Sequence, residues 1–198
     1  MLAEPEFSQS GDRGSRTHRA LFDAAAALFV ERGYEDTTMA DIADRAGTSR
    51  RTAFNHFPNK GDLPMLWVRL VADHAVKVAT DEAIEDVVER VRTYLRLLSQ
   101  AVEAEPVLSR QMMLGWTAAG GPTRYESQLL ADVTPWLHEG QAQGQVRASV
   151  DVAEAARALS DVLLGAVFRW VREPETPLQP RADGAVSLIL SALLSQDC

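Results

Sequence analysis

The chain has 198 residues, 46% of them hydrophobic and 24% charged, with a formal net charge of −8. This composition is typical of a globular protein large enough for one core or two small ones. The single cysteine, Cys198, excludes an internal disulfide, and no run of about 18 apolar residues would span a membrane. The acidic N-terminus is unlike a secretion signal, so we expect a cytoplasmic protein.

The charge is unevenly distributed along the chain. Residues 13–60 carry eight Lys and Arg against six acidic residues, whereas residues 61–198 carry twelve against nineteen, and the first twelve carry three acidic residues and no basic one. Only residues 13–60 have a positive balance, and it is small. If this region binds nucleic acid, we expect two copies on one DNA and binding that weakens strongly with salt.

Apolar residues recur at helical spacing through most of the chain, and no alternating Val- and Ile-rich runs indicate strands. We therefore predict an all-α fold of about nine helices. Residues 1–15 contain Glu, Pro, Ser, Gln and Gly without a period and are predicted to be a disordered arm. Arg13 and Arg16 at its end could reach a minor groove, and a solvated tail is the alternative.

The first predicted helix covers residues 16–32 and ends before Gly33. Its apolar residues have the i, i+3, i+4, i+7, i+8 spacing of a core-facing stripe: Leu21, Ala24, Ala25, Leu28 and Phe29.

Two short helices are predicted within residues 38–57. Thr38 and Asp41 form a capping signature for the first, and Gly47 is placed to end it. Thr48 or Ser49 can then cap a second helix, which carries two arginines in its first turn.

Two helices joined by a short glycine turn are typical of a helix-turn-helix, whose second helix enters the major groove of DNA. Arg50 and Arg51 lie where base edges would be met, and arginine can pair with guanine through two hydrogen bonds. Cations at this end oppose the helix dipole at a cost of roughly a few tenths of a kcal/mol, which suggests an external anion. The alternative is a solvated helix end with two ordinary surface arginines. We expect a small core made by Phe29, Ile42, Phe54 and Phe57.

A break at residues 58–61 precedes a fourth helix, predicted over residues 62–80. We expect Asp62 to cap it, because Pro64 then falls in the first turn, where its missing N–H is not needed. The predicted apolar face consists of Leu63, Leu66, Trp67, Leu70, His74 and Val78.

Five further helices are predicted over residues 81–104, 107–118, 123–143, 152–172 and 183–195. The apolar face of the first of these begins at Ile84, and Pro135 is expected to perturb the helix that contains it. Residues 120–122 and 173–180 are predicted loops.

The last two predicted helices carry more apolar surface than one helix face hides. We predict that they form an antiparallel pair that meets the pair of a second copy in a four-helix bundle, and an intramolecular core is the alternative. The predicted dimer residues are Leu159, Val162, Leu163, Ala166, Trp170, Leu188, Ile189 and Ala192.

Bulky residues at positions expected to face inward, between the fourth and eighth helices, indicate a mostly apolar small-molecule site. For each of them an ordinary core position is the alternative. The candidates are Trp67, His74, Tyr94, Met112, Met113, Trp116, Trp136 and Phe168.

Residues 16–63 resemble the DNA-binding domain of the tetracycline-repressor (TetR) family of transcription regulators. The matching residues are Ala24, Leu28, Phe29, Gly33, Tyr34, Thr37, Thr38, Ile42, Ala43, Ala46, Gly47, Ser49, Thr52, Phe54, His56, Phe57, Lys60 and Leu63. The family usually has Tyr at position 54 and a small apolar residue at position 48. Phe54 lacks the hydroxyl that commonly reaches a phosphate, so that contact is in doubt.

The resemblance implies a homodimeric repressor that binds double-stranded DNA at a near-palindromic operator, with half-sites about one helical turn apart. It also implies release by a small molecule, as yet unknown, that shifts the fourth helix. Arg50 and Arg51 would read bases and Thr38, Ser49, Thr52, His56 and Lys60 would hold phosphates. The full set of expected DNA-binding residues is Thr38, Thr48, Ser49, Arg50, Arg51, Thr52, Phe54, Asn55, His56 and Lys60. The expected domains are a disordered arm (1–15), a helix-turn-helix domain (16–61) and a helical ligand-binding and dimerisation domain (62–198).

An enzyme is the competing class, and the sequence offers it little support. The four histidines have no metal-ligand spacing, no serine lies in a G-x-S-x-G turn, and Gly121 and Pro122 stand where a phosphate-binding loop needs Lys and Ser or Thr. We therefore expect no catalytic site, no metal and no cofactor. A third class is a helical protein-interaction module that has lost specific DNA binding, which Phe54 favours and Arg50 and Arg51 oppose.

Overall fold

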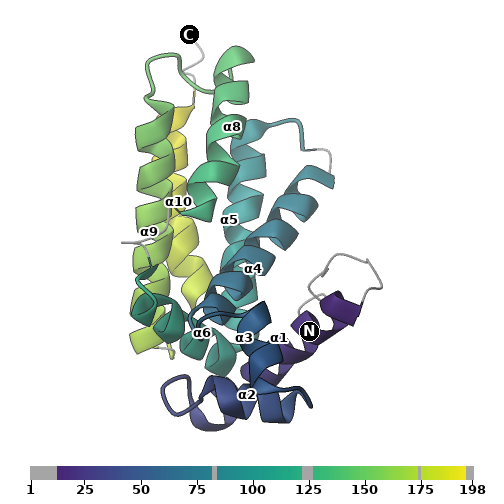
Figure 1. Ribbon diagram of the computed structural model, residues 1–198. Helices are drawn as coiled ribbons and strands as arrows, with labels where there is room; N and C mark the ends of the chain where they lie inside the picture. The colour runs from purple at the N-terminus through teal and green to yellow at the C-terminus, as the bar shows by residue number, and fades with distance from the viewer. Residues whose placement is uncertain (1–12, 82–83, 122–126, 174, 195–198) are drawn as a thin grey trace. The chain divides into compact units, whose positions relative to one another are not determined.

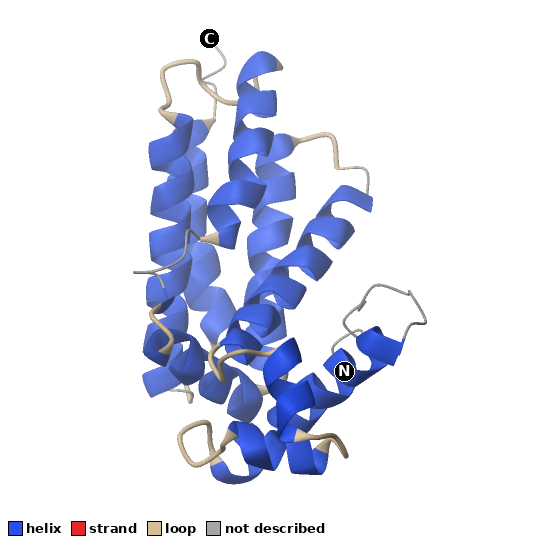
Figure 2. Cartoon of the chain, in the orientation of Figure 1, coloured by secondary structure: helices blue, strands red, loops and turns tan. Residues whose placement is uncertain are grey.

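The structure is a computed structural model that describes residues 13–81, 84–121, 127–173 and 175–194. In these ranges the chain forms nine α-helices, and its only β-type pairing is an isolated antiparallel bridge between Val146 and Leu194 (Figures 1 and 2). The all-α prediction is therefore confirmed. Within the same ranges, no helix has the length and apolar character needed to cross a membrane.

The chain divides into two compact units. The first comprises Met1–Leu70 and Glu105–Tyr125, and the second comprises Val71–Ala104 and Glu126–Cys198. One long helix passes from the first unit into the second, and a later helix of the first unit packs on its first helix.

The first unit contains the helices nearest the N-terminus together with one from the middle of the chain. They are α1 (Arg13–Arg32), α2 (Met39–Arg45), α3 (Arg50–His56), the start of α4 (Asp62–Asp81) and α6 (Pro106–Ala118). Its core is made by fully buried apolar side chains of α1, α2 and α3, including Leu21, Phe29, Ile42 and Ala53. Residues 13–15 are helical rather than part of the predicted arm, and residues 1–12 lie outside the described chain.

The predicted caps of the two short helices are confirmed. Thr38 and Asp41 form a complete capping box at the start of α2, and Gly47 follows the helix with a left-handed φ of 65°. Ser49 caps α3, since its side chain accepts a hydrogen bond from the Thr52 N–H.

Phe54 does not belong to the core, contrary to the prediction. Of the α3 side chains only Ala53 is buried, and Phe54 is 48% exposed. Phe57, just after the helix, is buried in its place. A short helix that packs through one small side chain leaves its other side chains largely to solvent, and Phe54 is one of them.

The helix α4 begins at Asp62 and has Pro64 as its third residue, as predicted. Asp62 is the first helical residue rather than the cap. Its carboxylate accepts a hydrogen bond from the Asn59 N–H, three residues earlier, at 2.8 Å. The predicted apolar face is wrong at His74, which is exposed. Small side chains, Ala72, Ala75 and Ala79, are buried in this part of the helix instead.

The second unit contains four packed helices that run alongside one another in Figure 1: α5 (Val87–Ala104), α8 (Gln128–Ala142), α9 (Val152–Arg172) and α10 (Leu178–Leu193). The helix α10 packs on α9 and α5, and α8 packs on the same two helices. The predicted and observed bounds of α9 are the same, and Asp151 caps this helix by accepting a hydrogen bond from the Glu154 N–H.

Three helices of the second unit start elsewhere than predicted. The helix α5 starts at Val87, because the Asp86 carboxylate accepts from the Glu89 N–H and caps the helix there; Ile84 lies in the preceding segment. The helix α10 starts five residues early at Leu178, since Pro180 is tolerated as its third residue. It ends at Leu193, and residue 195 lies outside the described chain. The helix α8 starts at Gln128 and contains Pro135, and residues 123–126 are also outside the description.

Candidate nucleic-acid interface

The outward face of α3 presents a compact set of exposed side chains. Beside the buried Ala53 the helix carries four exposed side chains: Arg50, Arg51, Phe54 and Asn55. Ser49 precedes the helix, and its hydroxyl pairs with the Thr52 hydroxyl at 2.8 Å in addition to capping the backbone. The cap therefore fixes the first turn, and the side chains that follow it project from a rigid helix end.

The guanidinium groups of Arg50 and Arg51 have neither an ion pair nor a hydrogen bond to any residue that the structure describes. Arginine carries five N–H donors in a planar fork that suits phosphate and guanine. Two exposed forks on adjacent residues of one helix are therefore available to an external anion.

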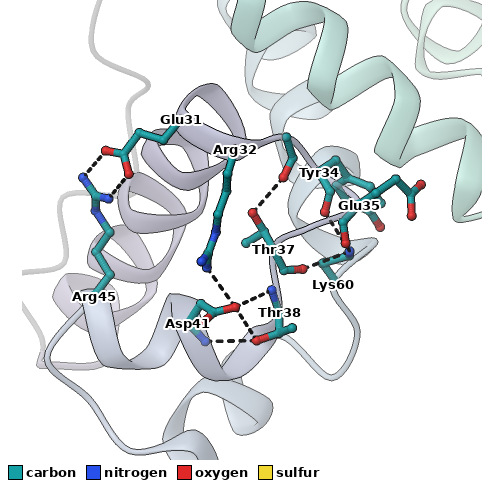
Figure 3. A network of polar contacts seen from close by, with 10 residues as sticks. Glu31, Arg32, Tyr34, Glu35, Thr37, Thr38, Asp41, Arg45 and Lys60 are labelled. Atoms are coloured by element: carbon teal, nitrogen blue, oxygen red, sulfur yellow. Dashed lines mark hydrogen bonds and ion pairs between the residues drawn. The ribbon is translucent and has the colours of Figure 1, made fainter.

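Two arginines of α1 and α2 are paired with neighbouring acids. Arg45 on α2 makes a two-pronged pair with Glu31 on α1, with N–O distances of 2.5 and 2.6 Å (Figure 3). Arg32 lies 2.8 Å from Asp41, which joins the end of α1 to the start of α2. These pairs fix the two helices to each other, whereas Arg50 and Arg51 of α3 keep exposed guanidiniums without an acid partner among the described residues.

Asp41 is the polar centre of this junction. Its carboxylate accepts hydrogen bonds from the Thr38 hydroxyl at 2.5 Å and from the Thr38 N–H at 2.9 Å, and Arg32 adds a third donor (Figure 3). These hydrogen bonds lower the pKa of Asp41 to about 2, because they favour the charged form. The Thr38 hydroxyl, predicted to hold a phosphate, is thus already engaged with a carboxylate.

Lys60, predicted to contact a phosphate, is engaged within the chain. Its ammonium group donates to the backbone carbonyls of Tyr34 at 2.8 Å, Thr37 at 3.0 Å and Glu35 at 3.4 Å, and it lies 4.1 Å from the centre of the Tyr34 ring (Figure 3). An ammonium has three N–H groups, and all three have acceptors here. Lys60 therefore fastens the turn between α1 and α2 to the start of α4.

The remaining predicted DNA contacts lie at the edge of the α3 face. Thr48 and His56 are half-buried. The His56 ring meets the His18 ring edge-on with 5.7 Å between centroids, and His18 stacks on Phe57 at 4.3 Å. Burial, and then the nearby His56, lower the pKa of His18.

Sequence reasoning missed two residues of α6 that support the turn after α1. The Gln111 side-chain oxygen accepts from the Tyr34 N–H at 2.8 Å. Gly115 lies directly against the Tyr34 ring, so that a Cβ there would be 2.5 Å from the ring and 2.7 Å from the Pro64 ring. A glycine inside a helix was the available signal, since it often marks close approach of another element.

The eight predicted ligand residues do not share one unit. Trp67, Met112, Met113 and Trp116 are buried in the first unit, whereas the second unit has Tyr94 buried, Trp136 and Phe168 half-buried and His74 exposed. The prediction that His74 faces inward is therefore wrong. For the buried side chains, burial is consistent with either a core or a pocket position.

A polar group in the second unit was not predicted. The Tyr94 hydroxyl donates to Asp132 at 2.6 Å, and the Gln128 amide donates to the other carboxylate oxygen at 3.0 Å. The Trp136 ring meets the Tyr94 ring edge-on at 5.5 Å. Burial raises the pKa of Tyr94, so the phenol stays protonated and acts as a donor.

The predicted dimer residues divide into two sets. Leu159, Leu163, Ala166 and Trp170 are buried within the single chain, so for these the alternative of an intramolecular core holds. The other four remain accessible: Val162 and Ile189 are half-buried, Ala192 is exposed and Leu188 is 75% exposed.

Comparison with known proteins supports the resemblance seen in the sequence. Residues 21–63 match the profile described as bacterial regulatory proteins, tetR family. The chain is 30% identical to the HTH-type transcriptional repressor KstR2 of Rhodococcus jostii over 212 aligned positions that cover 98% of each protein. It is 26% identical to the repressor KstR of Mycobacterium tuberculosis, over 96% of this chain and 87% of that one.

Solved structures share the fold along nearly the whole chain. Thermus thermophilus FadR, a TetR family transcriptional repressor solved with lauroyl-CoA, aligns with a TM-score of 0.71 and 21% identity, over 91% of this chain and 97% of that one. A regulator from Syntrophomonas wolfei aligns with a TM-score of 0.74 and 18% identity, over 93% and 100%. By sequence and by fold, the chain belongs to the TetR family of bacterial regulatory proteins.

Proposed function

We propose that this protein is a homodimeric transcriptional repressor that binds a near-palindromic operator through the outward face of α3 and leaves it when a small molecule binds. The observation that carries the proposal is the pair of unpaired guanidiniums of Arg50 and Arg51 on a rigidly capped helix. Relatives with aligned sequences along nearly their whole length are named transcriptional repressors, which supports the same activity here.

The electrostatics of the first unit favour specific over purely non-specific binding. Arg32 and Arg45 are paired with acids and Lys60 is bound to carbonyls, so few cations per protomer are left for phosphates. Each neutralised phosphate contributes about −0.9 to the slope of log affinity against log salt. In place of the strong salt dependence expected from the sequence, we therefore expect a shallow slope, with much of the specific affinity coming from base contacts by Arg50 and Arg51.

Two protomers per DNA follow from the small positive charge of one copy and from the accessible apolar residues of α9 and α10. Leu188, Ile189, Ala192 and Val162 are the side chains that a second copy would cover. A two-fold dimer presents two copies of α3, so the operator would be near-palindromic with half-sites about one helical turn apart.

Release by a small molecule is supported by the solved relatives with bound ligands, FadR with lauroyl-CoA and SmeT with triclosan. In this chain the candidate recognition group is Asp132 with Tyr94, beside the Trp136 ring, since it places one carboxylate next to two aromatic rings.

The test is binding of the purified protein to DNA from its own promoter region and to random DNA of equal length, over a salt series. We expect preference for the promoter fragment, a two-fold-symmetric footprint, and a loss of about 1–3 kcal/mol of discrimination per half-site in Arg51→Ala. Arg110→Ala is the matched control, because it removes the same charge from an exposed position on α6. Equal, weak binding of both DNAs would instead favour the alternative, a protein-interaction module without an operator.

A further inference from the structure

Phe54 is a large apolar side chain at the centre of a polar surface. It is 48% exposed, and the core of the first unit closes without it, since Phe29, Ile42 and Phe57 are buried. Folding therefore does not require an aromatic residue at this position. Exposed apolar area on a folded protein is unfavourable in water, and beside a binding site it often takes part in contacts.

The neighbours of Phe54 on α3 are the two unpaired arginines. Arg50 lies four residues before it and Arg51 three, and these are the spacings at which helical side chains are adjacent on the surface. The face thus combines two planar, cationic hydrogen-bond donors with one ring that has no donor and no acceptor. Such a face complements a surface that is anionic, carries acceptors and has a small apolar feature.

The major groove of DNA is a surface of this kind. Its base edges offer hydrogen-bond acceptors, hydrogen-bond donors and one apolar group, the C5 methyl of thymine. Arginine can pair with guanine, but a phenyl ring can distinguish bases only through that methyl group. Phe54 has no hydrogen-bonding group for the acceptors and donors of a base edge, so the thymine methyl is the group left for it to contact.

We propose that Phe54 packs against a thymine methyl group in each half-site of the operator, beside the base contacted by an arginine of the same helix. This inference rests on the proposed function, because it names a base that the α3 face reads. It assigns to Phe54 a role in specificity that requires no hydroxyl.

The experiment removes the methyl group and nothing else. Duplexes are selected from a random library with the wild-type protein, and each thymine of the selected site is then replaced singly by deoxyuridine. We expect one position per half-site at which the replacement weakens binding about four-fold, the effect of losing one buried methyl group. Replacing that position in both half-sites should weaken binding about fifteen-fold, and thymines outside the footprint should be without effect.

Two variants connect this effect to Phe54. Phe54→Ala should bind the thymine and uridine duplexes equally, whereas Phe54→Tyr keeps the ring and should keep the four-fold preference. Because the ring is half exposed and outside the core, the thermal unfolding of Phe54→Ala should match that of wild type.

The outcomes separate this inference from the function on which it rests. If the wild-type protein selects a site but no uridine replacement weakens binding, or Phe54→Ala keeps the same preference, the thymine contact is refuted and operator binding stands. If Phe54→Ala lowers the affinity for the thymine duplex and for the uridine duplex by the same factor, the preference for thymine remains. The ring then contacts the sugar–phosphate backbone, and the thymine contact is refuted. If wild type selects no sequence at all, the proposed function and the inference fail together.

Discussion

Gly115→Ala is a sharp test of the packing that holds the turn between α1 and α2. The added Cβ would lie 2.5 and 2.6 Å from two atoms of the Tyr34 ring and 2.7 Å from the Pro64 ring. Both rings are rigid, and the Tyr34 backbone is held by Gln111 and Lys60, so the strain cannot relax by a simple side-chain rotation. Overpacking of this kind typically costs about 1–3 kcal/mol.

The expected net effect allows for helix propensity, which favours Ala over Gly by about 1 kcal/mol inside a helix. With three close contacts we expect the upper part of the overpacking range, and hence a net loss of about 1–2 kcal/mol. For a chain of this length that corresponds to roughly 2–8 °C in Tm.

The matched control is Gly165→Ala in α9, where a Cβ would meet no atom within 4 Å. That variant should be as stable as wild type or up to about 1 kcal/mol more stable. Denaturant unfolding followed by tryptophan fluorescence is a suitable assay, because Trp67 and Trp116 belong to the first unit. Equal stability changes in the two variants would refute the reasoning. In a Tyr34→Ala background the cost of Gly115→Ala should shrink, leaving only the contact with Pro64.

Three further predictions concern the same unit. Lys60→Ala should lower the free energy of unfolding by about 1–3 kcal/mol, because partly buried carbonyls lose a charged donor. The salt slope of DNA binding should stay the same, and a slope smaller by about 0.9 would instead indicate a phosphate contact. Ser49→Ala should lower the free energy of unfolding by about 1 kcal/mol through loss of the α3 cap, and Thr48→Ala, which removes no cap, should change it by less than about 0.5 kcal/mol. The stability that Asp41 adds relative to Asp41→Asn should be fully present above pH 3.8 and disappear as the pH falls through about 2, since the folded pKa is depressed. Unfolding curves of the two proteins that fail to converge at low pH would contradict this.

Features set by neighbouring residues were predictable from the sequence. The capping box of Thr38 and Asp41, the cap at Ser49, the stop at Gly47 and the full extent of α9 depend on residues within four positions of each other. The start of α5 is also set locally, since the Asp86 carboxylate accepts a hydrogen bond from the Glu89 N–H three residues on. The early start of α10 places Pro180 in the first turn, where proline is tolerated, as Pro64 is in α4.

The amphipathic pattern predicted which helices have a buried face, but not always which side chains lie on it. Phe54 was expected in the core and His74 on the apolar face of its helix, and both are exposed. Their neighbours Ala53 and Ala75 are buried instead. A period of 3.6 residues defines a stripe, and the neighbour across the interface decides which edge of the stripe is covered.

The sequence by itself determined the helical fold, the helix-turn-helix and the position of Arg50 and Arg51 on its second helix, because these depend on local capping and periodicity. Only the tertiary structure decided that Lys60 binds the carbonyls of the 34–37 turn, that Gly115 admits the Tyr34 ring and that Leu159 and Leu163 are core. Those contacts join residues separated by about twenty to eighty positions or depend on which helices pack together, and no local propensity specifies them.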